Sequence, residues 1–135
     1  MKSEEEIRKT FKLFWDENGI LNLTIFNESS DKEESVLVAK LITSAVENIF
    51  NQNPSKTVNV LLDLTSLKTL KVPPSSKARG IYVNLLHHNR INKIAIAGTS
   101  HFHVSIAKSL FTLAGKKKVN DFINQKEAIS WLRRE

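Results

Sequence analysis

The chain contains no cysteine, which excludes disulfide bridges and every metal, redox or nucleophilic site built on a thiolate. Glycine and proline are scarce, with four and three residues in 135. The few glycines form no phosphate-binding loop, no dinucleotide fingerprint and no Gly-x-Ser-x-Gly serine motif. Paired carboxylates are also missing from the apolar segments. We therefore expect no cofactor, no catalytic residues and no enzyme activity.

Long apolar runs are missing as well. No stretch reaches the ~18 apolar residues of a membrane-spanning helix, and the first part of the chain lacks the apolar core of a signal peptide. We therefore expect a cytoplasmic protein with no transmembrane segment. Hydrophobic residues make up 41% of the chain and charged residues 25%, which is typical of a globular protein. The length predicts a single domain over residues 10–135, preceded by an N-terminal extension over residues 1–9.

Charge is distributed unevenly along the chain. Residues 1–50 hold 6 basic and 10 acidic residues, whereas residues 51–135 hold 14 basic and 4 acidic ones. A basic C-terminal two-thirds would suit an anionic ligand such as nucleic acid, a nucleotide or a lipid headgroup. The lysines are scattered, however, which favours an ordinary solvated surface. The run Lys116-Lys117-Lys118 follows a predicted helix end, where the helix dipole favours cations.

Two alternating segments near the N-terminus predict an antiparallel hairpin. Their apolar residues are Phe11, Leu13 and Trp15 in the first segment, and Leu21, Leu23 and Ile25 in the second. A two-residue Asn-Gly turn would put the two sets on opposite faces. A three-residue loop over residues 17–19 instead pairs Trp15 with Leu21 and puts all six on one face. We therefore predict the three-residue loop, with Gly19 in the left-handed conformation.

Beyond the hairpin, helix-like and strand-like segments alternate. Nearly all-apolar runs at 58–64 and 93–98 are typical of strands covered on both faces, and 119–122 predicts a short last strand. Residues suited to cap helix N-termini predict four helices, which begin at Ser30, at Ser75 or Ser76, at Thr99 or Ser100, and at Asn124. Ser30 would form a capping box with Glu33. This order predicts an α/β fold with a mainly parallel sheet and an N-terminal antiparallel hairpin edge.

This arrangement resembles the STAS-like SpoIIAA-like family, the fold group of the anti-sigma-factor antagonists. The resemblance covers about residues 10–134 and is carried by the strings LFWDENGILNLTI, VLLDL, HHNRINKIAIAG and VNDFINQKEAISWL. It implies four or five strands, about four helices, no cofactor and a non-enzymatic regulatory or protein-interaction role. Antagonists of this group carry a phosphorylatable serine in an Asp-Ser-Ser/Thr-Gly string. Here Ser75-Ser76 match by position at a helix start, and Pro73-Pro74 stand before them.

The candidate site lies where strands end and the following helices begin, because ligands of parallel sheets gather there. If the strands over 58–64 and 93–98 are neighbours, the helix starts that follow them share one rim. Free amide groups and nearby cations would attract a partner's anionic group or stabilise a phosphoserine. The alternative is that these residues only cap helices or, for Asp63, the adjoining loop. The candidate residues are Ser75, Ser76, Lys77, Arg79, Asp63, Thr99 and Ser100.

The four histidines are not expected to bind a metal. His87 and His88 precede the strand over 93–98, whereas His101 and His103 follow it. Six strand residues at ~3.3 Å each separate the pairs by roughly 20 Å, and a metal–nitrogen bond is only ~2 Å long. We expect surface or capping roles for all four.

Two further surfaces would suit a partner. The exposed hairpin edge, with Phe14 on its outer face, would pair with another chain or with a second copy in a homodimer. The helices offer apolar residues outside their core stripes, such as Leu37 or Val46. A protein partner is the main prediction, and direct binding of an anionic ligand is the alternative.

Overall fold

A computed structural model describes residues 3–27, 29, 31–53, 57–67, 74–88 and 90–134. Within these residues a single sheet has the order β1-β2-β3-β4-β5. Its strands are β1 (Phe11–Trp15), β2 (Leu21–Ile25), β3 (Val58–Asp63), β4 (Ile91–Ala97) and β5 (Val119–Phe122). Strands β1 and β2 are antiparallel, and every later pair is parallel. The predicted α/β fold with a hairpin edge is confirmed.

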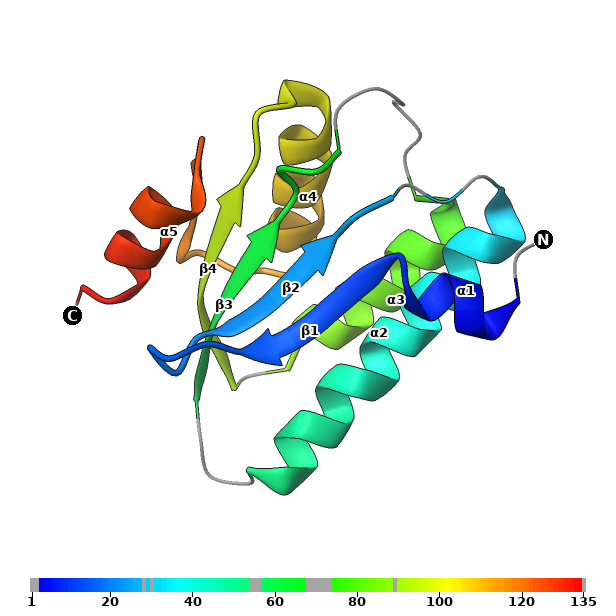
Figure 1. Cartoon of the computed structure of the whole chain (residues 1–135), viewed down its shortest axis with the longest axis horizontal. Coiled ribbons are helices and arrows are strands. Elements are labelled where there is room, and N and C mark those ends of the chain that lie inside the picture. The colour runs from blue at the N-terminus through cyan, green and yellow to red at the C-terminus, as the bar shows by residue number, and fades with distance from the viewer. Residues whose placement is uncertain are drawn as a thin grey trace.

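The helices form two layers around this sheet. They are α1 (Glu4–Arg8), α2 (Lys32–Gln52), α3 (Ser76–Leu86), α4 (His101–Leu113) and α5 (Gln125–Leu132). Helices α2, α3 and α4 connect β2 to β3, β3 to β4 and β4 to β5, and each pair of strands is adjacent in the sheet. Because such parallel connections are right-handed, all three helices lie on one face. Helix α5 follows the last strand and covers β3, β4 and β5 on the opposite face (Figure 1).

The hairpin register agrees with the three-residue loop. Trp15 pairs with Leu21, Leu13 with Leu23 and Phe11 with Ile25. Gly19 has a φ of 73°, the left-handed conformation that the bulged turn requires. Gly115 has a φ of 77° and lies just past α4, where the sequence predicted the end of that helix.

Two hydrophobic cores fill the two sides of the sheet, as the apolar strand sequences predicted. In β4, Ile94 and Ile96 face the larger core under α2, α3 and α4. Ala95 and Ala97, which alternate with these isoleucines along the strand, face the smaller core, into which Ala128 and Leu132 of α5 pack. Small residues on this second face allow α5 to lie directly on the strands.

Several local predictions require correction. Helix α2 is capped by Asp31, whose carboxylate accepts a hydrogen bond from Glu34 N at 2.8 Å. The predicted cap, Ser30, lies outside the described residues. Asp31 is favoured because its charge also complements the positive helix end. Val46, expected to lie outside the core stripe, is 6% exposed and belongs to the larger core. No helix among the described residues is long and apolar enough to cross a membrane.

The segment before the hairpin forms helix α1. Ser3 and Glu6 make a reciprocal capping box at its start, with Glu6 N donating to Ser3 Oγ at 3.2 Å. Its Ile7 is fully buried in the larger core, beside α2. The string Ser-Glu-Glu-Glu carries the capping-box spacing, so the sequence contained the signal for this helix.

Candidate functional site

The serine pair at the start of α3 has two different environments. Ser75 is the N-cap, and its hydroxyl accepts from Ala78 N at 3.2 Å. Its own backbone N–H donates to the buried Ser35 Oγ of α2 at 3.0 Å. Ser76 is the first residue of the helix and is exposed. The Ser35–Ser75 bond therefore joins the first turns of α2 and α3, and leaves Ser76 as the accessible serine of the pair.

A surface groove runs between these two first turns. It is lined by Lys32, Glu33, Val36, Leu37, Lys40, Ser75, Ser76 and Lys77. On α2, residues 32, 36 and 40 follow each other at a spacing of four, so they form a stripe along one side of the helix. Of the predicted site, Ser75, Ser76 and Lys77 line the groove. Leu37 also lines it; contrary to the expectation that it lies outside the core stripe, it is half-buried and packs against the larger core.

The groove carries a positive charge. Three lysines face one glutamate in its lining, a net of +2. Within the described residues no carboxylate forms an ion pair with Lys32, Lys40 or Lys77. Single surface charges contribute little, but a concave cluster of one sign raises the local concentration of anions. The sequence missed the two lysines of α2, because only tertiary packing brings the starts of α2 and α3 together.

The other predicted site residues lie elsewhere. Asp63 is 3% exposed on the face that α5 covers, and its carboxylate accepts from Thr65 N at 2.9 Å, from Thr65 Oγ1 at 2.7 Å and from Gln125 Nε2. Ser100 caps α4, and Thr99 precedes it. Strands β3 and β4 are neighbours, as the shared rim required. Even so, Arg79, Thr99 and Ser100 are not part of the groove lining. Asp63 thus fastens the end of β3 to α5.

The basic run after α4 is partly structural. Lys116 donates to His88 O at 2.9 Å and to Ile91 O at 3.3 Å, and burial lowers the pKa of its ammonium group. Lys118 donates to Asn92 Oδ1 at 3.4 Å. These bonds tie the end of α4 to the start of β4.

The histidines lie at both ends of β4, and their environments differ. His87 is the exposed C-cap of α3, and His101 is the exposed first residue of α4. His88 packs on Phe50, with ring centroids 4.6 Å apart. His103 is 7% exposed and lines the apolar cavity, contrary to the expected surface or capping role. No group of three metal-ligating side chains occurs in the described parts of the chain.

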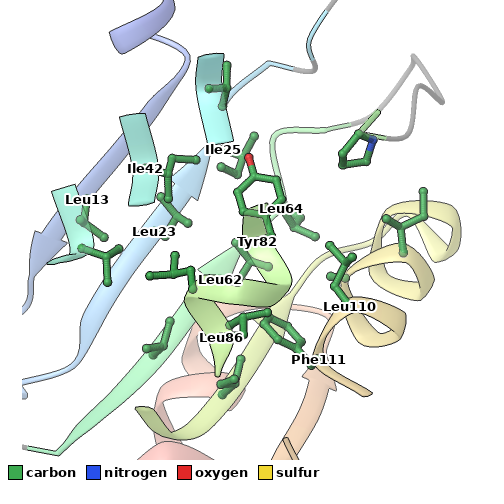
Figure 2. A pocket seen from close by; sticks show the side chains of 18 of the residues that line it. Leu13, Leu23, Ile25, Ile42, Leu62, Leu64, Tyr82, Leu86, Leu110 and Phe111 are labelled. Carbon is green, nitrogen blue, oxygen red and sulfur yellow. The ribbon is translucent and has the colours of Figure 1, made fainter. Parts of the chain in front are cut away.

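Beneath α3 the larger core contains an apolar cavity of about 210 Å³. Its walls come from the sheet and from α2, α3 and α4 (Figure 2). Nothing in the apolar pattern of the sequence distinguished this under-filled core from a close-packed one.

Tyr82 of α3 places a hydroxyl group in this apolar cavity. The hydroxyl forms no hydrogen bond with any residue that the structure describes, and burial raises the pKa of Tyr82. The Tyr82 side chain as a whole is half-buried.

The raised pKa of Tyr82 makes stability depend on pH in the alkaline range. The unfolded tyrosine ionises near its ordinary value of ~10, while folded Tyr82 stays protonated, so the free energy of unfolding falls as the pH rises above that value. Tyr82→Phe is expected to change stability little at pH 7, since the lost hydroxyl has no partner. Above pH ~10 the wild type should lose stability relative to the variant by up to about 1.4 kcal/mol per pH unit. Urea unfolding of both proteins across the alkaline range measures this difference, and parallel curves would contradict it.

Comparison with known proteins identifies the family. The search of curated proteins and the search of solved structures each found no significant match. A family model, described as SpoIIAA-like, matches residues 20–133. The matched region runs from β2 through α5 and includes the groove and all the named lining of the cavity except Leu13. The strand order, the helix order and this match agree, and the chain belongs to the SpoIIAA-like family of STAS-like regulatory, protein-interaction domains.

Proposed function

We propose that the chain is a non-enzymatic regulatory module that binds an acidic segment of a partner protein in the groove between the first turns of α2 and α3. The observation that carries this proposal is the set of three lysines that line one groove without ion-pair partners among the described residues. The family supports it, because SpoIIAA-like domains are generally regulatory modules without enzyme activity.

The chemistry of the groove favours a peptide over a bare anion. Between the lysines lie Val36 and Leu37, which offer apolar contact area beside the charges. Acidic residues of a partner would pair with Lys32, Lys40 and Lys77, and an apolar side chain would cover Leu37. Oppositely charged surfaces speed association and fix the orientation of the partner.

Ser76 is the proposed switch. Its hydroxyl lies in the groove beside Lys77, at the first position of α3. A phosphate there would be stabilised by the positive helix end and would neutralise the lysines that the partner needs. Phosphorylation of Ser76 would therefore release an acidic partner without unfolding the helix.

Charge reversal in the groove tests the binding proposal. Lys77→Glu and Ser76→Glu should each abolish retention of the partner when tagged protein is passed through a nuclease-treated lysate of the source cell. Lys126→Glu is the matched control, because Lys126 is an exposed lysine of α5 on the other face. Ser76→Glu should also leave stability equal or raise it by about 0.3–1 kcal/mol, since an acid is favourable in a first helical turn.

The result separates the proposal from its rivals. A protein retained by the wild type and by Lys126→Glu, and lost from both groove variants, supports the groove. Equal retention by all four proteins would place the interface elsewhere. Material that disappears on nuclease treatment would instead assign the basic surface to nucleic acid, whose affinity falls steeply with salt.

A further inference from the structure

Strand β1 forms an outer edge of the sheet, and part of its backbone points away from the molecule. The order β1-β2-β3-β4-β5 leaves one side of β1 without a neighbouring strand among the described residues (Figure 1). Phe26 N donates to Thr10 O at 2.8 Å, just before β1 begins. Because hydrogen-bonded residues alternate along an antiparallel pair, the even-numbered residues of β1 bond to β2. The N–H and C=O groups of Phe11 and Leu13 therefore point outward from the edge.

The two edges of the sheet differ in how they are protected from pairing. Natural edge strands are usually short, charged or interrupted by proline. The opposite edge strand, β5, is four residues long, and its two middle residues are polar and exposed. Strand β1 contains no proline, and Lys12 is its only charged residue. Its Phe11, Leu13 and Trp15 pack against the larger core but are only half-buried. The composition of β1 therefore favours pairing with a further strand.

The sequence of β1 is complementary to itself when two copies run antiparallel. Because the outward groups belong to odd-numbered residues, only registers that place odd opposite odd residues are compatible with hydrogen bonding. With Leu13 opposite Leu13 of a second copy, Phe11 lies opposite Trp15, and one apolar row crosses both chains. On the other face, Lys12 lies opposite Phe14 of the second copy, where a cation and an aromatic ring attract each other. Lys12 already lies over the ring of Phe14 in its own chain, 4.7 Å from the centroid.

Charges on either side of β1 fit the same register. Lys9 precedes the strand and Glu17 follows it, and both side chains are exposed. Neither forms an ion pair within the part of the chain that the structure describes. In the register centred on Leu13, Lys9 of each copy lies next to Glu17 of the other, so two opposite-charge pairs form. A parallel arrangement would instead bring like charges together at both ends.

From the outward backbone groups, the self-complementary strand and the charges beside it, we infer that the chain forms a homodimer through β1, in which the two sheets join edge to edge. The partner is a second copy of this chain, because the Lys12–Phe14 contact and the Lys9–Glu17 pair each form twice about one two-fold axis at Leu13. This surface shares no residue with the groove between α2 and α3, so the inference is independent of the proposed function.

Disulfide crosslinking tests the register, because the chain has no cysteine of its own. Lys12→Cys and Phe14→Cys chains, co-expressed and treated with oxidised glutathione, should form a covalent heterodimer. Opposed residues of a non-hydrogen-bonded pair lie ~4.5 Å apart at Cα, which is within the range of a disulfide. Each variant alone should crosslink much less, because like positions are not opposed in this register. Lys12→Cys co-expressed with Ser130→Cys, an exposed position on α5, measures chance collision.

Sedimentation equilibrium tests the charges. The wild type should dimerise reversibly, and Lys9→Glu should weaken the dimer about tenfold, because two attractive pairs become repulsive. The double variant Lys9→Glu/Glu17→Lys restores both pairs in reversed order, so it should recover the affinity of the wild type. Both side chains are exposed, so neither variant should change the secondary structure seen by circular dichroism.

Each experiment has a result that overturns the inference. A wild type that sediments as a monomer at all concentrations would leave the β1 edge to a strand of another protein. A dimer that Lys9→Glu does not weaken would place the interface elsewhere. Equal crosslinking of Lys12→Cys with Phe14→Cys and with Ser130→Cys would refute the register. None of these results bears on the groove between α2 and α3, which is tested with the partner protein and the Lys77→Glu variant.

Discussion

Ile96→Ala is expected to lower the free energy of unfolding by about 2–5 kcal/mol. Ile96 is fully buried in β4, the strand between β3 and β5, and packs into the larger core. Its side chain does not line the cavity, so its removal creates a new void in a close-packed region. A loss of this size is a large share of the roughly 5–15 kcal/mol that stabilises a typical domain.

Leu62→Ala provides the matched control. Leu62 pairs with Ile96 in the sheet and faces the same core, but it is half-buried and lines the existing cavity. Part of its side chain already faces empty space, so truncation removes fewer contacts. Urea unfolding of both variants should show a clearly smaller loss for Leu62→Ala. Equal losses would mean that the space under α3 is filled in solution.

Asp63→Ala is expected to cost about 2–4 kcal/mol while leaving partner retention unchanged. The buried carboxylate of Asp63 accepts three hydrogen bonds, two from Thr65 and one from Gln125. Hydrogen bonds to a charged group contribute about 1.5–3 kcal/mol each, and the loss is moderated here because Thr65 is half-buried and Gln125 is exposed, so water can reach these donors. The expected result therefore assigns Asp63 to the junction of β3 with α5 and not to a binding site.

Asp121→Ala separates this effect from a general loss of negative charge. Asp121 forms an ion pair with Lys108 at 2.9 Å, and both side chains are largely exposed. Such surface pairs contribute about 0–1 kcal/mol, so this variant should retain nearly the full stability. A small loss in Asp63→Ala, or a loss of the partner at full stability, would contradict the structural role.

The sequence predicted the fold well because the fold depends on local signals. Only one of the two loop lengths considered puts all six apolar residues of segment 11–25 on one face, and the structure has that register. Asn124 was predicted as a cap, and Ser75 and Ser100 were each one of two adjacent candidates, because a side-chain oxygen can accept from an exposed amide at a helix start. The cap at Asp31 was missed because serine and aspartate are both preferred N-cap residue types and the two stand side by side in the sequence.

The candidate site was less predictable because it depends on packing between distant elements. Sequence reasoning joined Ser75 with Thr99 and Asp63 through the shared edge of the sheet. In the structure the first turn of α2 comes next to Ser75 instead, through Ser35, and Asp63 points to the opposite face. The cavity has no sequence signal, because Leu23, Leu62 and Tyr82 would look the same in a filled core. How far α3 stands from the sheet is a property of the packed layers.

The measurement that tests the proposed function most directly is site-specific photo-crosslinking in living cells. A photoreactive amino acid at position 76 lies in the groove, and the same residue at exposed Ser130 of α5 lies on the other face. We predict that position 76 captures one partner protein and that position 130 does not, with the adduct lost when Lys77→Glu is added. Adducts of equal yield at both positions, or none at position 76, would contradict a groove that binds a partner protein.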